Sequence, residues 1–420
     1  MSYADTLDEN PTNEKSFDVV TSKKKKCLHC GNNQTSHVGA WVDSFIFLSI
    51  NPVSQKIFRT RIGHYLYWFT DNIIEYVIKV LAYVGVIRFS GQHQDAPSDR
   101  GRVLCEEAVA RRWNMETVLF LGRAIDMYRI TFSDGQQFIF SGLPRPHSRD
   151  DATAGWIDDK ALLKQCLMGG DVPVPQGKNV GDWKSAERVF NELQKPVIVK
   201  PRLGSRGRHT TTHISSIDDF KTAFNSAKKL CKEVVVEEHL EGSVYRATVI
   251  DGELAGVLAG DPPRITGDGS KTIAELIELK NRQRPSTVGL VVFTDTLITF
   301  LERLGYALDD VLDNKVIIDL SEKIGLSYGG NSREVTPDVH PKLRNELERA
   351  AKAVDDPLLG FDFITQDVSS DPDTMRWGII ECNASPFINL HHDPHEGLPV
   401  NVAAKVLDYV ERNRHLLGRM

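Results

Sequence analysis

Three oxygen-bearing side chains near the carboxyl end of the chain have the spacing of a divalent-metal site. Glu381 and Asn383 stand two apart in Trp377-Gly-Ile-Ile-Glu-Cys-Asn, an apolar run typical of a strand, so their side chains share one face. Asp362 belongs to the preceding predicted strand and reaches that face if the two strands pair antiparallel. Carboxylate and amide oxygens suit Mg²⁺, which usually keeps water and substrate phosphates as further ligands. The alternative is an ordinary set of polar side chains at a strand end.

A basic, glycine-bearing stretch is suited to the phosphates of a nucleotide. Lys200 ends the apolar run Val197-Ile-Val-Lys and is followed by Pro-Arg-Leu-Gly-Ser-Arg-Gly. Glycines let backbone N–H groups approach phosphate oxygens, and an ammonium group neutralises their charge. The spacing is not that of a P-loop, G-x-x-x-x-G-K-[ST], which is therefore excluded. Taken alone, such a loop is weak evidence, because most loops of this kind are solvated turns.

The elements that must position these residues are predicted from pattern. Asp158 or Asp159 caps a helix that begins near Lys160, and Val234-Val-Val-Glu-Glu238 is a second buried strand. The pair Asp251-Gly252 predicts a type I′ turn between two strands. The remaining predicted elements are that hairpin (245–250 with 253–259), a second hairpin (128–132 with 136–140), helices 272–281 and 341–355, and strands 360–366 and 377–383.

The first hundred residues carry weaker signals. Cys27-Leu-His-Cys30 is half of a zinc site, to which His29 or His37 could add a ligand. Because no second pair follows at the usual spacing, two thiols without a metal are the favoured interpretation. The most apolar stretch, 65–89, carries Glu75 and Lys79, each costing about 2.5–3.5 kcal/mol at mid-bilayer. We therefore predict an amphipathic helix packed on a core.

Length and composition limit the class of protein. A chain of 420 residues suggests two or three domains. The formal net charge of −6 disfavours binding of nucleic acid by the whole chain, and six scattered cysteines indicate reduced thiols. The first 22 residues are polar and lack the apolar core of a secretion signal. We predict a cytoplasmic protein with no nucleic-acid partner and no stable membrane insertion.

The order of the motifs is more specific than any one of them. Asp-Lys160 is followed by Val-Ile-Val-Lys-Pro-x-x-Gly-x-x-Gly, Val-Val-Val-Glu-Glu-x-Leu-x-Gly, Tyr-Arg246 in a hairpin, Gly-x-Asp and Glu-x-Asn-x-x-Pro. This order resembles the ATP-grasp ligases, most closely the ATP-grasp domain of cyanophycin synthetase and glutathione-synthetase-type enzymes. The resemblance covers about residues 150–410. Further matching stretches are 267–277, Gly329-Gly330, 335–341, and His392 with Gly397.

The resemblance implies an α+β ATP-grasp fold, in which two α+β subdomains clasp ATP, with an additional N-terminal region. Composition and pattern divide the first part of the chain into a flexible polar leader (1–36), a helical N-terminal region of unknown role (37–100) and a small α/β unit (101–155). The resemblance then implies a small ATP-grasp subdomain (156–260) and a large subdomain with the metal site (261–420).

The same resemblance assigns roles to individual residues. Lys160 and Lys200 match the lysines that hold the nucleotide phosphates, and Arg246 matches the arginine that faces the transferred phosphate. The alternative for Arg246 is a cross-strand ion pair. ATP and Mg²⁺, for which Mn²⁺ can substitute, are the implied cofactors. The other implied site residues are the phosphate-covering loop (Gly204, Ser205, Gly207), the adenine hinge (Glu237, Glu238, Leu240) and the metal ligands (Asp362, Glu381, Asn383).

The implied reaction joins a carboxylate to an amine through an acyl phosphate, with release of ADP and phosphate. Amino acids or short peptides are the implied substrates, and a homo-oligomer is left open. Val244 replaces the acid that usually binds ribose, and Arg264 follows the proline matching Pro262 instead of preceding it. One alternative is a ligase that modifies a protein or peptide terminus. Another is a non-catalytic nucleotide-binding regulator, which Val244 favours and the predicted metal ligands oppose.

Overall fold

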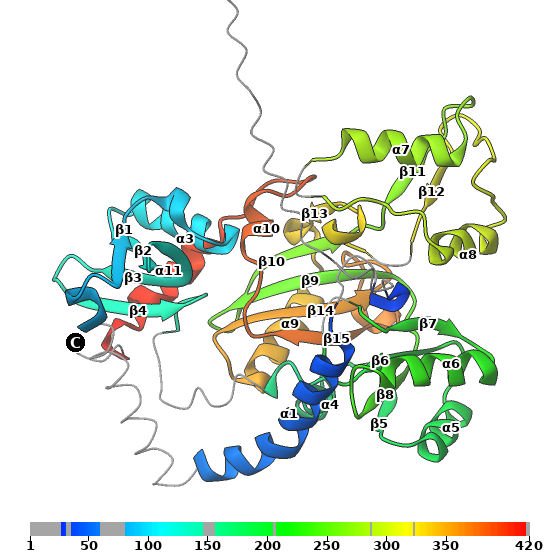
Figure 1. The fold of residues 1–420 in the computed structure, drawn as a ribbon, viewed down its shortest axis with the longest axis horizontal. Helices are drawn as coiled ribbons and strands as arrows, with labels where there is room; N and C mark the ends of the chain where they lie inside the picture. The colour runs from blue at the N-terminus through cyan, green and yellow to red at the C-terminus, as the bar shows by residue number, and fades with distance from the viewer. Residues whose placement is uncertain are drawn as a thin grey trace, which may run out of the picture.

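The structure is a computed structural model, shown in Figure 1, that describes residues 27–30, 35–58, 80–145, 156–204, 207–285, 288–321 and 324–416. Its described part combines helices with antiparallel sheets of five, four, four and two strands. The predicted α+β class is therefore confirmed. None of the described helices has the length and apolarity needed to cross a membrane. Most of the apolar stretch 65–89 lies outside the described residues.

The central sheet has the strand order β13-β10-β9-β14-β15, and all its neighbouring strands are antiparallel. The predicted hairpin is confirmed, since Asp251 and Gly252 have φ angles of +53° and +77°, as a type I′ turn requires. The predicted boundary at residue 260 falls at the end of β10, inside this sheet. The strands are β9 (Ser243–Ile250), β10 (Glu253–Gly260), β13 (Ser332–Glu334), β14 (Leu358–Thr365) and β15 (Gly378–Asn383).

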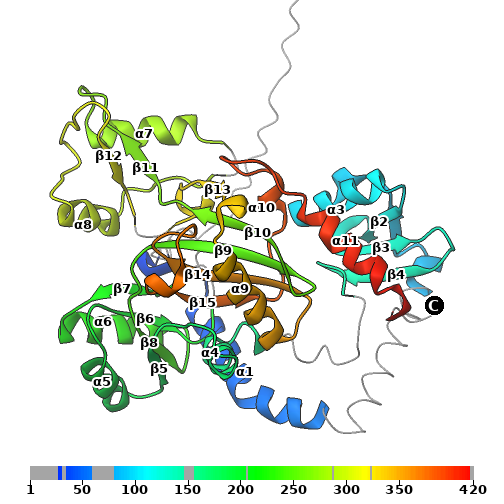
Figure 2. The same ribbon diagram turned by 180° about the vertical axis from the view of Figure 1, so that it is seen from behind.

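Two helices cover one face of the central sheet, as Figure 2 shows. In α4 (Lys160–Gly169) the N-cap is Asp159, whose carboxylate accepts hydrogen bonds from the backbone N–H groups of the first turn. In α9 (Pro341–Val354) an apolar stripe faces the sheet, as the sequence pattern predicts. Tyr245 on β9 and Phe361 on β14 point into this core. Their neighbours along each strand therefore point to the opposite face.

A smaller sheet, with the order β5-β8-β6-β7, forms a separate lobe beside the central sheet (Figure 1). We call it the small lobe. The predicted strands 197–200 and 234–238 are confirmed as its two inner strands. Two helices pack against it around Phe190 and Phe220. Its elements are β5 (Gly177–Val180), β6 (Val197–Pro201), β7 (Thr211–Ile214), β8 (Val234–Glu238), α5 (Trp183–Glu192) and α6 (Ile217–Lys228).

A further lobe, formed by the residues between β10 and β13, is inserted into the central sheet. Its helix α7 (Ile273–Gln283) begins where the sequence predicts, because Thr272 and Glu275 form a reciprocal capping box. A core of its own, around Ile277 and Leu301, holds the lobe together. The other elements are β11 (Arg264–Thr266), β12 (Ile317–Asp319) and α8 (Asp295–Arg303).

The N-terminal lobe contains elements from both ends of the chain. Its sheet has the order β1-β2-β3-β4, and α11 (Val402–Arg412) packs on α3 (Asp99–Ala110) in a shared core. The predicted hairpin 128–140 is confirmed. The region 37–100, predicted to be helical, contains a helix, α1 (His37–Phe58). The end of the stretch 65–89 was predicted as an amphipathic helix, but it belongs instead to a strand, β1, because this segment pairs with β2. The strands are β1 (Ile87–Ser90), β2 (Asn114–Phe120), β3 (Arg123–Thr131) and β4 (Gln137–Ser141).

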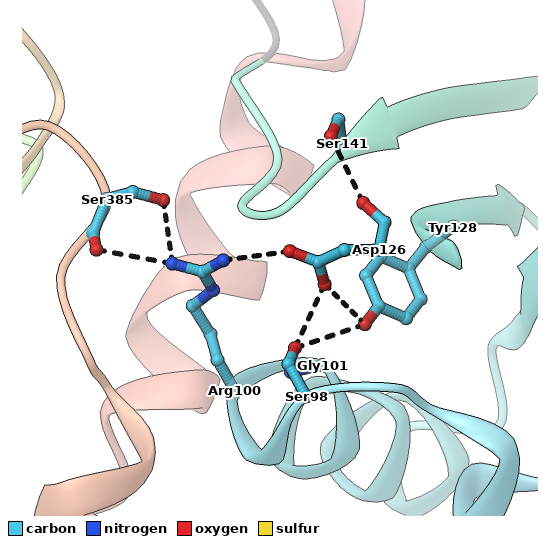
Figure 3. Close-up of polar contacts among 7 residues, drawn as sticks. All are labelled: Ser98, Arg100, Gly101, Asp126, Tyr128, Ser141 and Ser385. Atoms are coloured by element: carbon cyan, nitrogen blue, oxygen red, sulfur yellow. Dashed lines mark hydrogen bonds and ion pairs between the residues drawn. The ribbon is translucent and has the colours of Figure 1, made fainter. Parts of the chain in front are cut away.

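A network of hydrogen bonds ties this lobe to the loop that follows β15 (Figure 3). Arg100 donates to the backbone oxygen (3.2 Å) and the hydroxyl (2.8 Å) of Ser385, and also to the carboxylate of Asp126 (2.9 Å). Asp126 in turn accepts from Ser98 (2.9 Å) and Tyr128 (2.8 Å). Because Ser385 lies two residues after Asn383, the N-terminal lobe braces the end of the strand that carries the predicted metal ligands.

Gly101 is expected to be indispensable to this network. A Cβ atom there would lie 1.8 Å from the hydroxyl of Tyr128, whose ring is fully buried and cannot move aside. We expect Gly101→Ala to lower the free energy of unfolding by about 1–3 kcal/mol in denaturant titrations, despite the better helix propensity of alanine. Gly91→Ala, with nothing within 4 Å of the new atom, is the matched control. Adding Tyr128→Phe should recover part of the loss; equal stability of Gly101→Ala and Gly91→Ala would refute the clash.

Candidate nucleotide and metal site

A buried lysine and a partly buried lysine share one buried glutamate of the small lobe. Glu237 on β8 receives the ammonium of Lys200 from the neighbouring strand β6 at 2.8 Å and that of Lys164 from α4 at 2.6 Å. The side chain of Glu237 is only 2% exposed. Burial alone would raise the pKa of Glu237, but the two ammonium groups hold this pKa below its usual value. The glutamate therefore stays charged and fixes both lysines.

Lys164 is a member of this cluster that the sequence analysis did not include. It stands one helical turn after Lys160, so the two side chains lie on the same face of α4. That i, i+4 spacing is the signal that could have indicated it. Burial lowers the pKa of Lys164, while Glu237 opposes the shift.

Lys160 and Lys200 both reach strand β15 of the central sheet. Lys160 Nζ lies 3.6 Å from a carboxylate oxygen of Glu381, and Lys200 Nζ lies 3.5 Å from the carbonyl oxygen of Ile380. Both lysines are buried. The structure thus joins the two predicted phosphate lysines to the strand with two of the predicted metal ligands, although Lys200 belongs to the small lobe and β15 to the central sheet.

The predicted phosphate-covering loop, which we call the glycine loop, contacts Lys160 at its first residue, Gly204. The ammonium of Lys160 donates to the carbonyl oxygen of Gly204 at 2.6 Å. Gly204 and Gly207 have φ angles of +119° and +59°, conformations that side chains disfavour. A Cβ atom on Gly207 would lie 3.6 Å from the hydroxyl of Tyr328, which precedes β13. Ser205 lies outside the described residues, and its predicted role stays a prediction.

The carboxylates of the predicted hinge residues Glu237 and Glu238 have different partners. Glu238 alternates with Glu237 along β8, accepts a hydrogen bond from the backbone N–H of Gln176 at 2.6 Å and forms an ion pair with Arg376. Leu240 is buried just beyond the strand. Of the predicted hinge, Glu237 is therefore the residue whose carboxylate belongs to the lysine cluster.

The predicted antiparallel pairing of the two acidic strands is confirmed, with Asp362 opposite Glu381 and Gly360 opposite Asn383. Next along β14, Phe363 stands opposite Ile379, so that Ile380 is an extra residue in β15. This bulge explains how both Ile379 and Cys382 point into the core, although they stand three apart. It also sets Glu381 and Asn383 on the face opposite that core, together with Asp362.

Arg246 forms the cross-strand ion pair that the sequence analysis held as its alternative. It stands opposite Asp362, and two hydrogen bonds of 2.7 and 2.8 Å join its guanidinium to that carboxylate. The charge of Asp362 raises the pKa of Arg246. Such a bidentate pair fixes both side chains at the edge of the site. The two interpretations are compatible, since a guanidinium has further donors to offer a phosphate.

The donor set of Asp362, Glu381 and Asn383 fits Mg²⁺. All three side chains offer oxygen atoms, they share one face of two paired strands, and Glu381 keeps 25% of its side chain exposed. The positive charges of Lys160, Lys200 and Arg246 surround the same strands. A separate cavity of about 350 Å³, lined by Arg264, lies in the lobe of α7 and β11, and none of these site residues lines it. This geometry suits a polyphosphate together with a divalent cation.

Comparison with known proteins agrees with this geometry. A bifunctional glutathione synthetase from Pasteurella multocida superposes with a TM-score of 0.54 at 21% identity, covering 75% of this chain and 44% of that protein. The chain has an ATP-grasp fold. No protein-family model matches it.

The ATP-grasp chain is also similar in sequence to curated proteins. It is 34% identical to a cyanophycin synthetase from Synechocystis sp. over 259 residues, which are 60% of this chain and 30% of that protein. A glutathione biosynthesis bifunctional protein GshAB from Clostridium perfringens is 27% identical over 291 residues, or 66% and 37% of the two chains. The chain thus spans about a third of the length of these relatives. The resemblance stated from the motifs is confirmed.

Proposed function

We propose that the protein is an ATP-dependent ligase that joins a carboxylate to an amine and releases ADP and phosphate. One observation carries the proposal: the ammonium groups of Lys160 and Lys200 lie next to Glu381 and to the backbone of Ile380 on β15. Buried ammonium groups beside a set of hard oxygen ligands suit the phosphates of ATP and their metal. The similarity to a cyanophycin synthetase and to a glutathione biosynthesis protein supports a ligase reaction.

Each cationic side chain has a place in the proposed reaction. Lys160 and Lys200 bind the nucleotide phosphates, and Arg246 stabilises the phosphoryl group during its transfer. Mg²⁺ held by Asp362, Glu381 and Asn383 would neutralise charge on the phosphates. Mn²⁺ can take its place, because it accepts the same oxygen ligands. Positioning and electrostatics therefore account for most of the catalysis.

The substrate carboxylate is the proposed attacking group. One of its oxygens forms a bond to the γ-phosphorus while the bond from that phosphorus to the bridging oxygen of ADP breaks. The amine then attacks the acyl carbon, phosphate leaves with the bonding electrons, and the amine nitrogen loses a proton. Cys382 stands between the two ligands on β15, but burial raises the pKa of its thiol well above the usual value. It therefore stays protonated inside the core and is no covalent nucleophile.

Hydroxylamine is expected to trap the intermediate. With ATP, Mg²⁺ and a carboxylate that the enzyme accepts, added hydroxylamine should give a hydroxamate and stoichiometric ADP, because it attacks acyl phosphates. Mass spectrometry identifies the hydroxamate, and a reaction without the carboxylate is the control. Release of AMP and pyrophosphate would show an adenylate intermediate and would contradict the proposed mechanism while leaving the fold unaffected.

The substrate class is best tested by a screen of amino acids, short peptides and peptide C-termini for ADP release that depends on both a carboxylate and an amine. Products identified by mass spectrometry separate a ligase of free amino acids from one that modifies a peptide or protein terminus. ATP binding without any dependent turnover would favour the non-catalytic regulator.

A further inference from the structure

Two cysteines and two histidines from distant parts of the chain meet beside the small lobe. Cys27 and Cys30 lie at either end of a short segment that Figure 1 shows near β7, His37 begins α1, and His209 precedes β7. Their Sγ and Nε2 atoms all lie within 4.8 Å of one another. Among the described residues, no other group of three or more His, Cys, Asp or Glu side chains gathers its ligand atoms in this way.

Four of the six separations between these atoms match the edges of a tetrahedral zinc site, and the other two are within 4.8 Å. Nε2 of His209 lies 3.5 Å from Sγ of Cys27, 3.4 Å from Sγ of Cys30 and 3.3 Å from Nε2 of His37. Sγ of Cys30 lies 3.3 Å from Nε2 of His37. A regular tetrahedron with Zn–S bonds of about 2.3 Å and Zn–N bonds of about 2.0–2.1 Å has edges of about 3.3–3.8 Å. His209 therefore already stands at ligand spacing from the other three side chains.

His209 is oriented for this role by its surroundings. Its side chain is buried, and its Nδ1–H donates to the carbonyl oxygen of Ser226 at 2.8 Å, which leaves Nε2 as the free lone pair facing the other three side chains. A metal-binding histidine usually has such a second partner. Its φ of +52° is uncommon for a residue with a side chain, and its backbone N–H donates to the carbonyl oxygen of His29 at 3.0 Å.

The four atoms are of the kinds that zinc selects. Once His209 donates through Nδ1, its Nε2 is an acceptor, and the thiols around it are weak donors. Two sulfurs and two imidazole nitrogens are the usual ligands of Zn²⁺, whereas Mg²⁺ prefers oxygen. The four ligands leave no open position, which is typical of structural rather than catalytic zinc.

We propose that Cys27, Cys30, His37 and His209 bind one structural Zn²⁺, which fastens the N-terminal segment to the small lobe next to the glycine loop. The site is independent of the proposed ligase activity. It completes the half-site seen in the sequence, where two thiols without a metal were favoured. Local spacing could not indicate His209, which stands 182 residues after Cys27. His37, and not the exposed His29, supplies the nearer histidine.

The full chain should be purified without chelator and its metal content measured by mass spectrometry. We expect about one zinc per chain. After removal of zinc, Co²⁺ should give the visible bands of a tetrahedral site together with thiolate charge-transfer absorption in the near ultraviolet. Wild-type protein free of zinc, or a Co²⁺ spectrum without thiolate bands, would overturn the proposal.

Single substitutions identify the ligands. Cys27→Ser and His37→Ala should each weaken zinc binding at least about 100-fold in competition with a chelator, since loss of a second-shell partner alone costs about 10- to 100-fold. His29→Ala, which changes a histidine between the two cysteines, and Cys166→Ser, which changes a remote thiol, are matched controls that should keep full zinc. Thermal unfolding of each variant with and without Zn²⁺ shows whether it is folded. Folded ligand variants that keep wild-type affinity, or an equal loss in His29→Ala, would refute the assignment.

Discussion

Glu381→Gln should remove nearly all ligase turnover while the protein stays folded. The substitution replaces a charged oxygen ligand with a neutral one of the same size, on the face shared with Asp362. We expect kcat to fall by at least about 100-fold, the effect of removing one group that stabilises developing charge. ADP release under saturating substrates is the measurement.

The stability of this variant is its internal control. Glu381 is partly exposed, and its contact with Lys160 is long at 3.6 Å, so the free energy of unfolding should change by less than about 1 kcal/mol. Glu253→Gln, an exposed acid at the other end of the same sheet, should leave turnover unchanged. Activity of Glu381→Gln within a few-fold of wild type, at equal stability, would show that Glu381 is not a ligand.

Lys200→Ala should weaken ATP binding severely. A charge-assisted hydrogen bond contributes about 1.5–3 kcal/mol, so the dissociation constant measured by calorimetry should rise about 10- to 150-fold. The lysine is held at the end of β6 by Glu237, with its ammonium also near the backbone of β15. Its loss therefore removes a charge that is already positioned for the phosphates.

Lys164→Ala is the matched control for this variant. Lys164 and Lys200 both form ion pairs with Glu237, so either substitution leaves the buried carboxylate with one partner and should destabilise the fold by up to about 3 kcal/mol. Lys164 has no proposed contact with phosphate. If both variants lose ATP affinity equally, the effect comes from the disturbed Glu237 and the phosphate role of Lys200 is wrong.

Local sequence was sufficient for many of the elements. The apolar runs that become β6 and β8, the turn at Asp251 and Gly252, and the capping box at Thr272 are features of a few neighbouring residues. Propensity, turn chemistry and capping act over such short distances, so their outcome can be read from the chain. The order of the motifs also indicated the fold and the set of candidate site residues.

Features that depend on packing were not predictable in this way. The bulge at Ile380 exists because residues three apart in β15 must both enter the core while Glu381 stays outside it. The pairing of Arg246 with Asp362 follows from the register between β9 and β14. The register between two strands determines which residue stands opposite which. The sequence of one strand alone does not contain this information.

The most distant contacts were decided by tertiary structure alone. The helix α11 completes the N-terminal lobe, and His209 joins two cysteines near the start of the chain. Nothing in the residues around His209 sets it apart from any other histidine. The cysteines and His37 come close to it only because the N-terminal segment packs beside the small lobe. Contacts between residues so far apart in the chain are determined by the packing of whole elements and not by local preference.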